Sequence, residues 1–206
     1  MYNQPSGRIE RAIGLFLVLG SIANVVGVVM FSLRDGTSGT PPPSFAYYVW
    51  ERGFFMAAVL LTSVGFVLLE GHLHTSAGRV LARTGATTYL FAGILGVAAE
   101  ALDVSRTGQN LYPLIVVYVV LAFLGQAAIG GALRQSGLLA PWIGWVTIVW
   151  NLAWLVVLPV ITPGDIYFPI LHHLMPLLIG GALLRRAPLP RGSRQQTEQQ
   201  EAPVPH

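Results

Sequence analysis

Residues 12–33 read AIGLFLVLGSIANVVGVVMFSL and contain no charged side chain. A helix needs about 20 mainly apolar residues to cross the roughly 30 Å of hydrocarbon in a bilayer. The whole chain has the same character, because 53% of its 206 residues are hydrophobic, only 10% are charged, and the mean hydropathy is +0.61. Ordinary soluble domains carry about 25% charged residues. The chain therefore has too few charged side chains to cover the surface of a soluble monomer.

Five further apolar stretches follow, and the connections between them are short. Lipid tolerates no open sheet, and the alternation typical of a barrel is absent, so we expect helices. The longest connection, residues 34–45, is rich in Gly, Ser and Pro. The first stretch is longer than the 7–15 apolar residues of a signal-peptide core, which indicates an uncleaved helix. We predict one all-α, six-span membrane domain, residues 1–186, with spans at about 12–33, 46–69, 84–102, 111–133, 138–161 and 166–184.

The positive side chains are all Arg, and their placement predicts the orientation of the helices. If the N-terminus is cytoplasmic, the outer side carries Arg34, Arg52 and Arg106, and the inner side carries Arg8, Arg11, Arg79, Arg83, Arg134, Arg185, Arg186, Arg191 and Arg194. This bias follows the positive-inside rule. We therefore expect both termini in the cytoplasm and the protein in a bacterial-type inner membrane. Residues 187–206 change abruptly to Pro, Gln, Arg and Glu and are expected to form a disordered cytoplasmic tail.

The residue types that the chain lacks exclude several kinds of chemistry. Without Lys there is no retinal Schiff base, pyridoxal aldimine or phosphate-loop lysine. Without Cys there is no disulfide, thiolate metal site or cysteine nucleophile. Neither an Asp-x-x-x-Asp nor a Gly-x-Ser-x-Gly pattern occurs. The pI of about 9.6 comes from the inner-side arginines, so we expect no nucleic-acid partner. No cofactor can be assigned from the sequence.

A five-residue pattern occurs twice, because residues 129–133 and 179–183 both read IGGAL. Repeated hairpins are typical of transporter scaffolds. However, Gly and Ala also recur wherever membrane helices approach each other closely. Besides the lipid bilayer, we therefore expect either internal packing or a partner, a second copy or another membrane protein, at the pairs of small residues four apart, Ala92 with Gly96 and Ala127 with Gly131.

Ionisable residues inside a membrane span indicate function by default. One group comes from three different spans but from a similar, outer level, and we predict that it forms an outward-facing pocket: Glu51, Arg52, Glu100, Asp103, His172 and His173. A second group, Glu70, His72 and His74, belongs to the inner side. Three amides lie deeper, Asn24, Gln126 and Asn151. We expect these amides to form structural hydrogen bonds between helices, worth on the order of 1 kcal/mol each.

The histidines do not predict a haem or a metal site. His72 and His74 lie roughly 25 Å from His172 along the membrane normal, at about 1.5 Å per helical residue, so they cannot share one haem with it. His172 and His173 are neighbours and point about 100° apart on a helix. One of them together with a nearby carboxylate would suit a divalent ion. Because no His-x-x-x-His spacing occurs, we predict no metal.

Two prolines flank the histidine pair, in the stretch at 167–176, YFPILHHLMP. Proline in a membrane helix frees backbone carbonyl groups and kinks the axis. Kinks beside ionisable residues are typical of binding cavities. Pro169 and Pro176 therefore support a cavity at the level of the outer pocket.

Three functions agree with this pattern. The leading hypothesis is a pocket for a small or lipophilic ligand, in which carboxylate and imidazole groups relay protons for coupled transport. The first alternative is an accessory or structural subunit, whose faces of small residues pack against partner membrane proteins. The polar residues then have a structural role, in which Arg52 forms an ion pair with Glu100 or Glu51. The second is a membrane enzyme that protonates a lipid or isoprenoid through Glu51, Glu100 and His172. The sequence does not identify the substrate or decide among the three.

Overall fold

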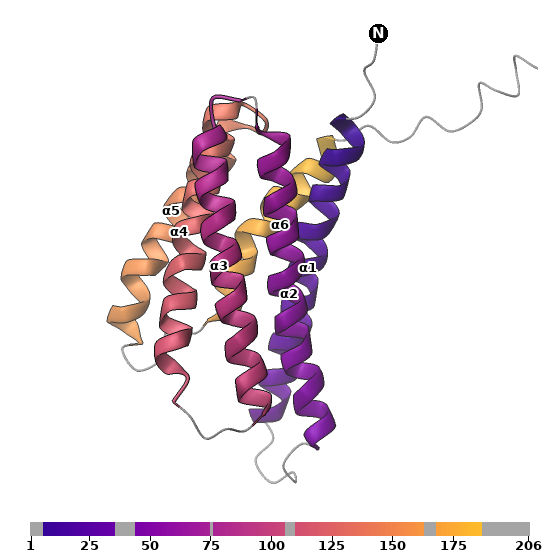
Figure 1. Ribbon diagram of the computed structural model, residues 1–206, viewed down its shortest axis with the longest axis vertical. Coiled ribbons are helices and arrows are strands. Elements are labelled where there is room, and N and C mark those ends of the chain that lie inside the picture. Colours follow the sequence, from indigo (N-terminus) through magenta and orange to yellow (C-terminus); the bar gives the residue numbers. More distant parts are fainter. Residues whose placement is uncertain (1–5, 36–43, 75, 106–109, 163–167, 187–206) are drawn as a thin grey trace, which may run out of the picture.

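The computed structural model describes residues 6–35, 44–74, 76–105, 110–162 and 168–186. Within these residues the chain forms six helices and no strand (Figure 1). The helices are α1 (Ser6–Asp35), α2 (Phe45–His72), α3 (Arg79–Val104), α4 (Tyr112–Ser136), α5 (Pro141–Ile161) and α6 (Pro169–Arg186). The all-α class predicted from the sequence is confirmed. The expected tail, residues 187–206, lies outside the described residues.

Local chemistry explains where the helices begin and end. The side-chain oxygen of Ser44 accepts a hydrogen bond from the backbone N–H of Tyr47 at 3.3 Å and caps α2. Gly137 ends α4 with a φ of 65°, in the left-handed region that glycine adopts without penalty. Pro141 opens α5, where its missing N–H leaves no hydrogen bond unmade. Such signals place the ends a few residues away from the limits of the apolar stretches.

Five of the helices, α1 to α5, are long and apolar enough to cross a membrane. The remaining helix, α6, has only 18 residues, which is about 27 Å at 1.5 Å per residue. Its two histidines and its terminal Arg185 and Arg186 also lower its hydropathy. The architecture is consistent with an integral membrane protein. The sixth predicted span is present as a helix, α6, but it is not one of the five helices that are long and apolar enough to cross a membrane.

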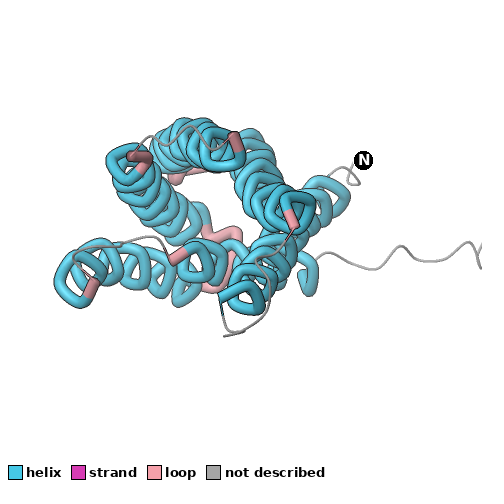
Figure 2. The backbone as a smooth tube through the Cα atoms, turned by 90° about the horizontal axis from the view of Figure 1, so that it is seen from below, coloured by secondary structure: helices cyan, strands magenta, loops and turns pink. Residues whose placement is uncertain are grey.

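Consecutive helices from α1 to α5 pack side by side, and α6 returns across the bundle to lie against α1 (Figures 1 and 2). The contacts of α6 with α4 and α5 are sparse. The beginning of α1 and the end of α6 therefore share one end of the bundle, which we call the near end (Figure 1). The far end is the one at which α1 ends and α2 begins.

Aromatic side chains fill the interior of the bundle. Phe66, Tyr89, Tyr118 and Phe123 are fully or almost fully buried, and the rings of Phe66 and Tyr89 meet edge to face at 4.9 Å. The outer faces are also apolar, and α5 in particular exposes Val149, Val156 and Val160. An apolar exterior around a packed aromatic interior suits a bundle surrounded by hydrocarbon.

Several close helix crossings depend on glycine. A Cβ on Gly180 would lie 2.9 Å from the carbonyl oxygen of Gly14, and a Cβ on Gly130 would lie 2.8 Å from that of Gly144. Gly130 and Gly180 are the first glycines of the two IGGAL copies. Close backbone contact therefore explains why both copies have glycine at this position. The second glycines differ, because a Cβ on Gly181 would meet nothing within 4 Å.

The pairs of small residues four apart also pack inside the chain. A Cβ on Gly96 would lie 2.9 Å from the ring of Tyr118, and a Cβ on Gly131 would lie 2.9 Å from the side chain of Leu81. These positions therefore serve the packing of α3 against α4. The partner expected at them stays a prediction.

The two adjacent glycines of α6 provide a matched test of this packing. Gly180→Ala should lower the free energy of unfolding by about 1–3 kcal/mol, because the added methyl group meets a backbone oxygen that cannot rotate away. Gly181→Ala should leave stability unchanged or raise it by about 0.5–1 kcal/mol through helix propensity. Thermal unfolding of the two purified variants in the same detergent makes the comparison. A Gly180→Ala protein as stable as wild type would contradict the crossing of α1 and α6.

Candidate functional site

Five polar side chains of α2 and α3 form one network at the far end. Arg52 is at its centre: Nη1 lies 2.9 Å from Oε2 of Glu100, Nη2 lies 3.2 Å from Oδ2 of Asp103, and Nε lies 3.5 Å from Oε1 of Glu51. The hydroxyl of Tyr48 donates a hydrogen bond to the same Oδ2 of Asp103. The guanidinium carbon of Arg52 lies 5.0 Å from the centre of the Tyr48 ring. Arg52 thus joins α2 to α3, and it pairs with both of the glutamates considered from the sequence.

Helical spacing explains why these side chains meet. Tyr48 and Arg52 are four residues apart, and Glu100 and Asp103 are three apart, so each pair shares one face of its helix. Glu51 is fully buried, whereas 41% of the Asp103 side chain is exposed. Within the network, three carboxyl groups share one guanidinium. The network therefore holds more acidic groups than basic ones.

A cavity of about 470 Å³ borders the network and lies among α1, α2, α3, α4 and α6. Its volume falls in the range of about 300–1,000 Å³ that is typical of small-molecule sites. Its polar lining comes from Ser32, Arg52, Glu100 and Asp103. The other lining residues are apolar: Val28, Phe31, Phe55, Ala99, Leu111, Ile115, Phe168, Pro169 and Ile170. The cavity thus combines one charged wall with apolar walls, and this combination suits an amphiphilic molecule.

The two histidines are fully or almost fully buried and do not line this cavity. The ring of His172 stacks between those of Phe123, at 4.1 Å, and Tyr118, at 5.6 Å. Among the described residues, neither ring nitrogen of His172 has a hydrogen-bond partner. Nδ1 of His173 donates to the carbonyl oxygen of Pro169 at 3.1 Å. A buried imidazole without partners is costly, and such groups are often functional or bound to water.

Tyr118 lies close to both His172 and α3. Its ring stacks on that of His172, and a Cβ on Gly96 would lie 2.9 Å from the same ring. Gly96 lies one helical turn before Glu100 on α3. Among the described residues, His172 forms no side-chain hydrogen bond with a member of the network.

Three consecutive carbonyl oxygens of α6 are bound by three other helices. Leu171 O accepts from Nε1 of Trp150 (3.1 Å), His172 O from Nε2 of Gln126 (2.9 Å), and His173 O from Oγ of Ser21 (2.9 Å). Pro176 has no N–H and cannot donate to the carbonyl oxygen of His172, four residues before it. The side chain of Gln126 makes this hydrogen bond instead and holds α6 where the contacts of α4 with α6 are otherwise sparse.

The other two buried amides behave differently from Gln126. Nδ2 of Asn151 donates to the carbonyl oxygen of Thr147 at 2.7 Å, in its own helix rather than in a neighbouring one. Neither side-chain atom of Asn24 has a hydrogen-bond partner among the described residues. In the described structure, Gln126 is the amide of the three that bonds to another helix.

Sequence reasoning missed several residues of the site. The position of Tyr48 four residues before Arg52 could have identified it, because residues with this spacing share a helix face. Phe31, Phe55 and Phe168 line the cavity, and Tyr118 lies between His172 and Gly96. These four are aromatic residues in apolar surroundings, and no local pattern distinguishes them from packing residues.

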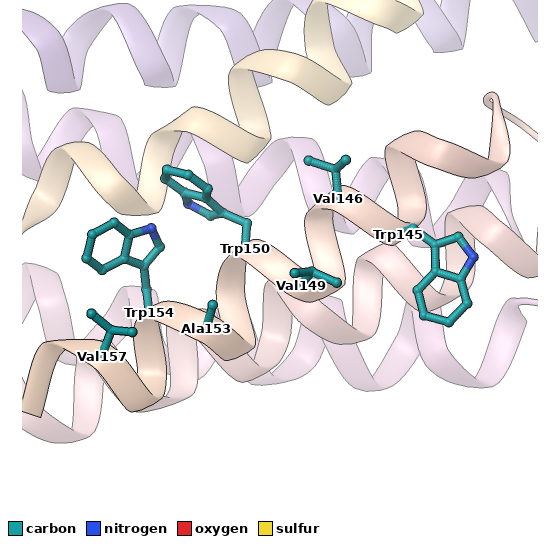
Figure 3. Close-up of a pocket in the computed structure, with 7 residues that line it drawn as sticks. All are labelled: Trp145, Val146, Val149, Trp150, Ala153, Trp154 and Val157. Atoms are coloured by element: carbon teal, nitrogen blue, oxygen red, sulfur yellow. The ribbon is translucent and has the colours of Figure 1, made fainter. Parts of the chain in front are cut away.

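A second cavity, of about 480 Å³, lies along α5 and is lined by Trp145, Val146, Val149, Trp150, Ala153, Trp154 and Val157 (Figure 3). None of these side chains is ionisable. The indole N–H of Trp150 is already donated to α6. This cavity therefore offers contact to apolar molecules such as acyl chains and no acid–base chemistry.

Within the described ranges, no three His, Cys, Asp or Glu side chains are placed to hold a metal ion together. No family model, curated protein or solved structure matches this chain. The network of Arg52 and its cavity are thus the features of the described structure that combine buried charge with space for a ligand.

Removing the guanidinium tests the network. Arg52→Met should lower the free energy of unfolding by up to about 3–5 kcal/mol, because buried carboxylates lose their partner. Glu100→Gln added to Arg52→Met should restore part of this loss. Chemical unfolding in detergent measures both variants. The control is Arg79→Met at the exposed near end, which should change stability by less than about 0.5 kcal/mol. Equal effects of the two Arg substitutions would contradict the central role of Arg52.

Proposed function

We propose that the chain is a six-span protein of a bacterial-type inner membrane with both termini in the cytoplasm. We further propose that its cavity opens outward, binds a small lipophilic ligand, and couples the movement of that ligand to protons. The observation that carries the proposal is the cavity at the far end, where apolar walls meet the network of Arg52, Glu100 and Asp103.

The distribution of arginine supports this orientation. The near end carries Arg8, Arg11, Arg79, Arg83, Arg134, Arg185 and Arg186, and most of these side chains are exposed. Under the positive-inside rule an end so rich in Arg faces the cytoplasm. The far end, with the cavity, then faces outward.

Since the chain has no Cys, single cysteines report its topology directly. Ser105→Cys at the far end should react with a membrane-impermeant maleimide in intact cells, because we place it outside. Gln135→Cys at the near end should react only after the membrane is permeabilised. Both positions are exposed on the protein, so the side of the membrane on which each residue lies decides whether it is labelled. The reverse pattern would overturn the orientation, and labelling of both residues from outside would contradict the crossing of the membrane by α4, which lies between them.

The lining of the cavity supports a lipophilic ligand. Most of it is apolar, including Phe31, Phe55 and Ile115, and the charged groups lie on the wall formed by α2 and α3. A molecule with an apolar body and one polar group can satisfy both parts. An inorganic ion would leave the apolar walls without contacts, and a hydrocarbon would leave the charged wall without a partner.

The surplus of carboxyl groups supports proton coupling. Glu51, Glu100 and Asp103 share the single charge of Arg52, so the network can exchange a proton when a ligand enters. His172 lies further toward the middle of the bundle, where its ring stacks on that of Tyr118. Intramembrane carboxylates and histidines of this kind form proton relays in transporters.

The packing of the small residues counts against the accessory-subunit alternative. The small residues that would have contacted a partner subunit, such as Gly96 and Gly131, pack within the chain.

Filling the cavity tests the proposal. Ala99→Phe should abolish ligand binding, because Ala99 lines the cavity and a phenyl ring would occupy it. The probes are 1-decanol, decanoate and decyltrimethylammonium, each added to protein in nanodiscs. At least one of them should raise the stability of the wild-type protein, by about 2.7 kcal/mol at a concentration one hundred times Kd. Addition of the probe that binds, to protein in weak buffer, should also change the pH of the solution.

The matched control is Ala153→Phe in the cavity along α5, which should leave the stabilisation intact. Ala99→Leu serves the same purpose if Ala99→Phe does not fold. Stabilisation that survives both substitutions at Ala99, or that is absent for all three probes, would refute the ligand site. Binding without any change in pH would refute proton coupling alone.

A further inference from the structure

We propose that the ligand of this cavity is a lipophilic cation, with an amine, quaternary ammonium or phosphonium group carried on an apolar or aromatic body. This inference rests on the function proposed above and narrows it to one class of substrate. Three features of the cavity support it: its charge balance, the position of Asp103, and the aromatic rings of its lining.

The charge balance of the network favours a cation over an anion. Glu51, Glu100 and Asp103 lie around one guanidinium, with nitrogen–oxygen distances between 2.9 and 3.5 Å. Each of Nε, Nη1 and Nη2 of Arg52 lies within 3.5 Å of a carboxylate oxygen, so an anionic ligand that approached Arg52 would also approach three acidic groups. Among the described residues, the network presents three carboxyl groups and one guanidinium, so a cation meets more groups of opposite charge there than an anion does.

Asp103 is the acidic group best placed to meet a ligand. It lines the cavity, and 41% of its side chain is exposed, compared with 8% for Glu100. Arg52 and Tyr48 both bind Oδ2 of Asp103, and neither of these contacts involves Oδ1. A ligand cation can therefore approach Asp103 while Arg52 stays with Glu100 and Glu51.

The aromatic lining suits a cation in particular. Phe31 of α1, Phe55 of α2 and Phe168 before α6 come from three separate parts of the chain and border the same cavity as Asp103. The face of an aromatic ring attracts a cation, more strongly where the cation is desolvated, and aromatic cages bind quaternary ammonium groups. Because such a group donates no hydrogen bond, rings and a carboxylate satisfy it completely. The remaining apolar walls then contact its body.

Cation and proton should compete for this site. Within the part of the chain that the structure describes, the titratable and charged groups that face Asp103 are Tyr48, Glu51 and Arg52 of α2 and Glu100 of α3, and the described lining from α1, α4 and α6 adds no titratable side chain. Protonation of Asp103 or Glu100 removes the negative charge that attracts the ligand. Binding of a lipophilic cation should therefore weaken as the pH falls and should release protons.

Two ions of nearly the same size and opposite charge test the inference. Tetraphenylphosphonium and tetraphenylborate are each added to the full-length protein in phosphatidylcholine nanodiscs, and nanodiscs with Ala99→Phe serve as the blank for binding to lipid. We expect saturable binding of tetraphenylphosphonium that weakens at low pH, and no cavity-dependent binding of tetraphenylborate. Asp103→Asn should weaken the binding of the cation by about tenfold or more, as removal of one partner of a charge pair does.

Glu70→Gln, at the opposite end of α2, is the matched control and should leave the affinity unchanged. Glu100→Gln provides a second variant of the network and should also weaken binding of the cation. Preferential binding of tetraphenylborate, or equal affinity of wild type and Asp103→Asn for the cation, would overturn the cation inference and leave a lipophilic ligand site in place. If neither ion, and none of the decyl probes, binds in a way that Ala99→Phe removes, the proposed function fails as well.

Discussion

A charged group inside an apolar bundle must find its counter-charges within the protein, and Arg52 is the group on which this constraint acts most strongly. Its guanidinium contacts carboxylates of α2 and α3 and lies on the ring of Tyr48. Because the pairs hold two helices in register at the far end, they also define one wall of the cavity. Without Arg52, its partners Glu51 and Glu100 would be buried charges without this compensation. Structure and candidate function thus depend on the same contacts.

The second constraint is the backbone of α6. This helix is short, touches α4 and α5 only sparsely, and contains Pro176, which leaves a carbonyl oxygen without its usual donor. A buried carbonyl group must be satisfied, and Gln126 supplies the missing hydrogen bond. In this arrangement Phe168 and Pro169 line the cavity, and His172 does not. Pro176 weakens α6, and the carbonyl oxygen that it leaves without a donor is bound by α4.

Depth along the spans predicted much of the candidate site. Arg52, Glu100 and Asp103 were expected at one level, and the structure brings them into contact. The same reasoning grouped His172 with them, but this side chain lies outside the cavity lining, between aromatic rings. Depth is a single coordinate, and it does not state which way a side chain points around its helix. Asn151 shows the same gap, since its amide bonds within its own helix although its depth suited a link to another.

The sequence by itself determined that the chain is helical, apolar and built of spans, because the cost of exposing charge or unpaired backbone to hydrocarbon acts on every residue locally. It also determined which ionisable groups are expensive enough to require partners. Only the tertiary structure decided which residues are the partners of these ionisable groups. In the folded chain, Arg52 contacts three carboxylates, the carbonyl group of His172 accepts a hydrogen bond from Gln126, and three phenylalanines line one cavity. These outcomes depend on how the helices are rotated and crossed, which glycine contacts between distant segments set and no local pattern contains.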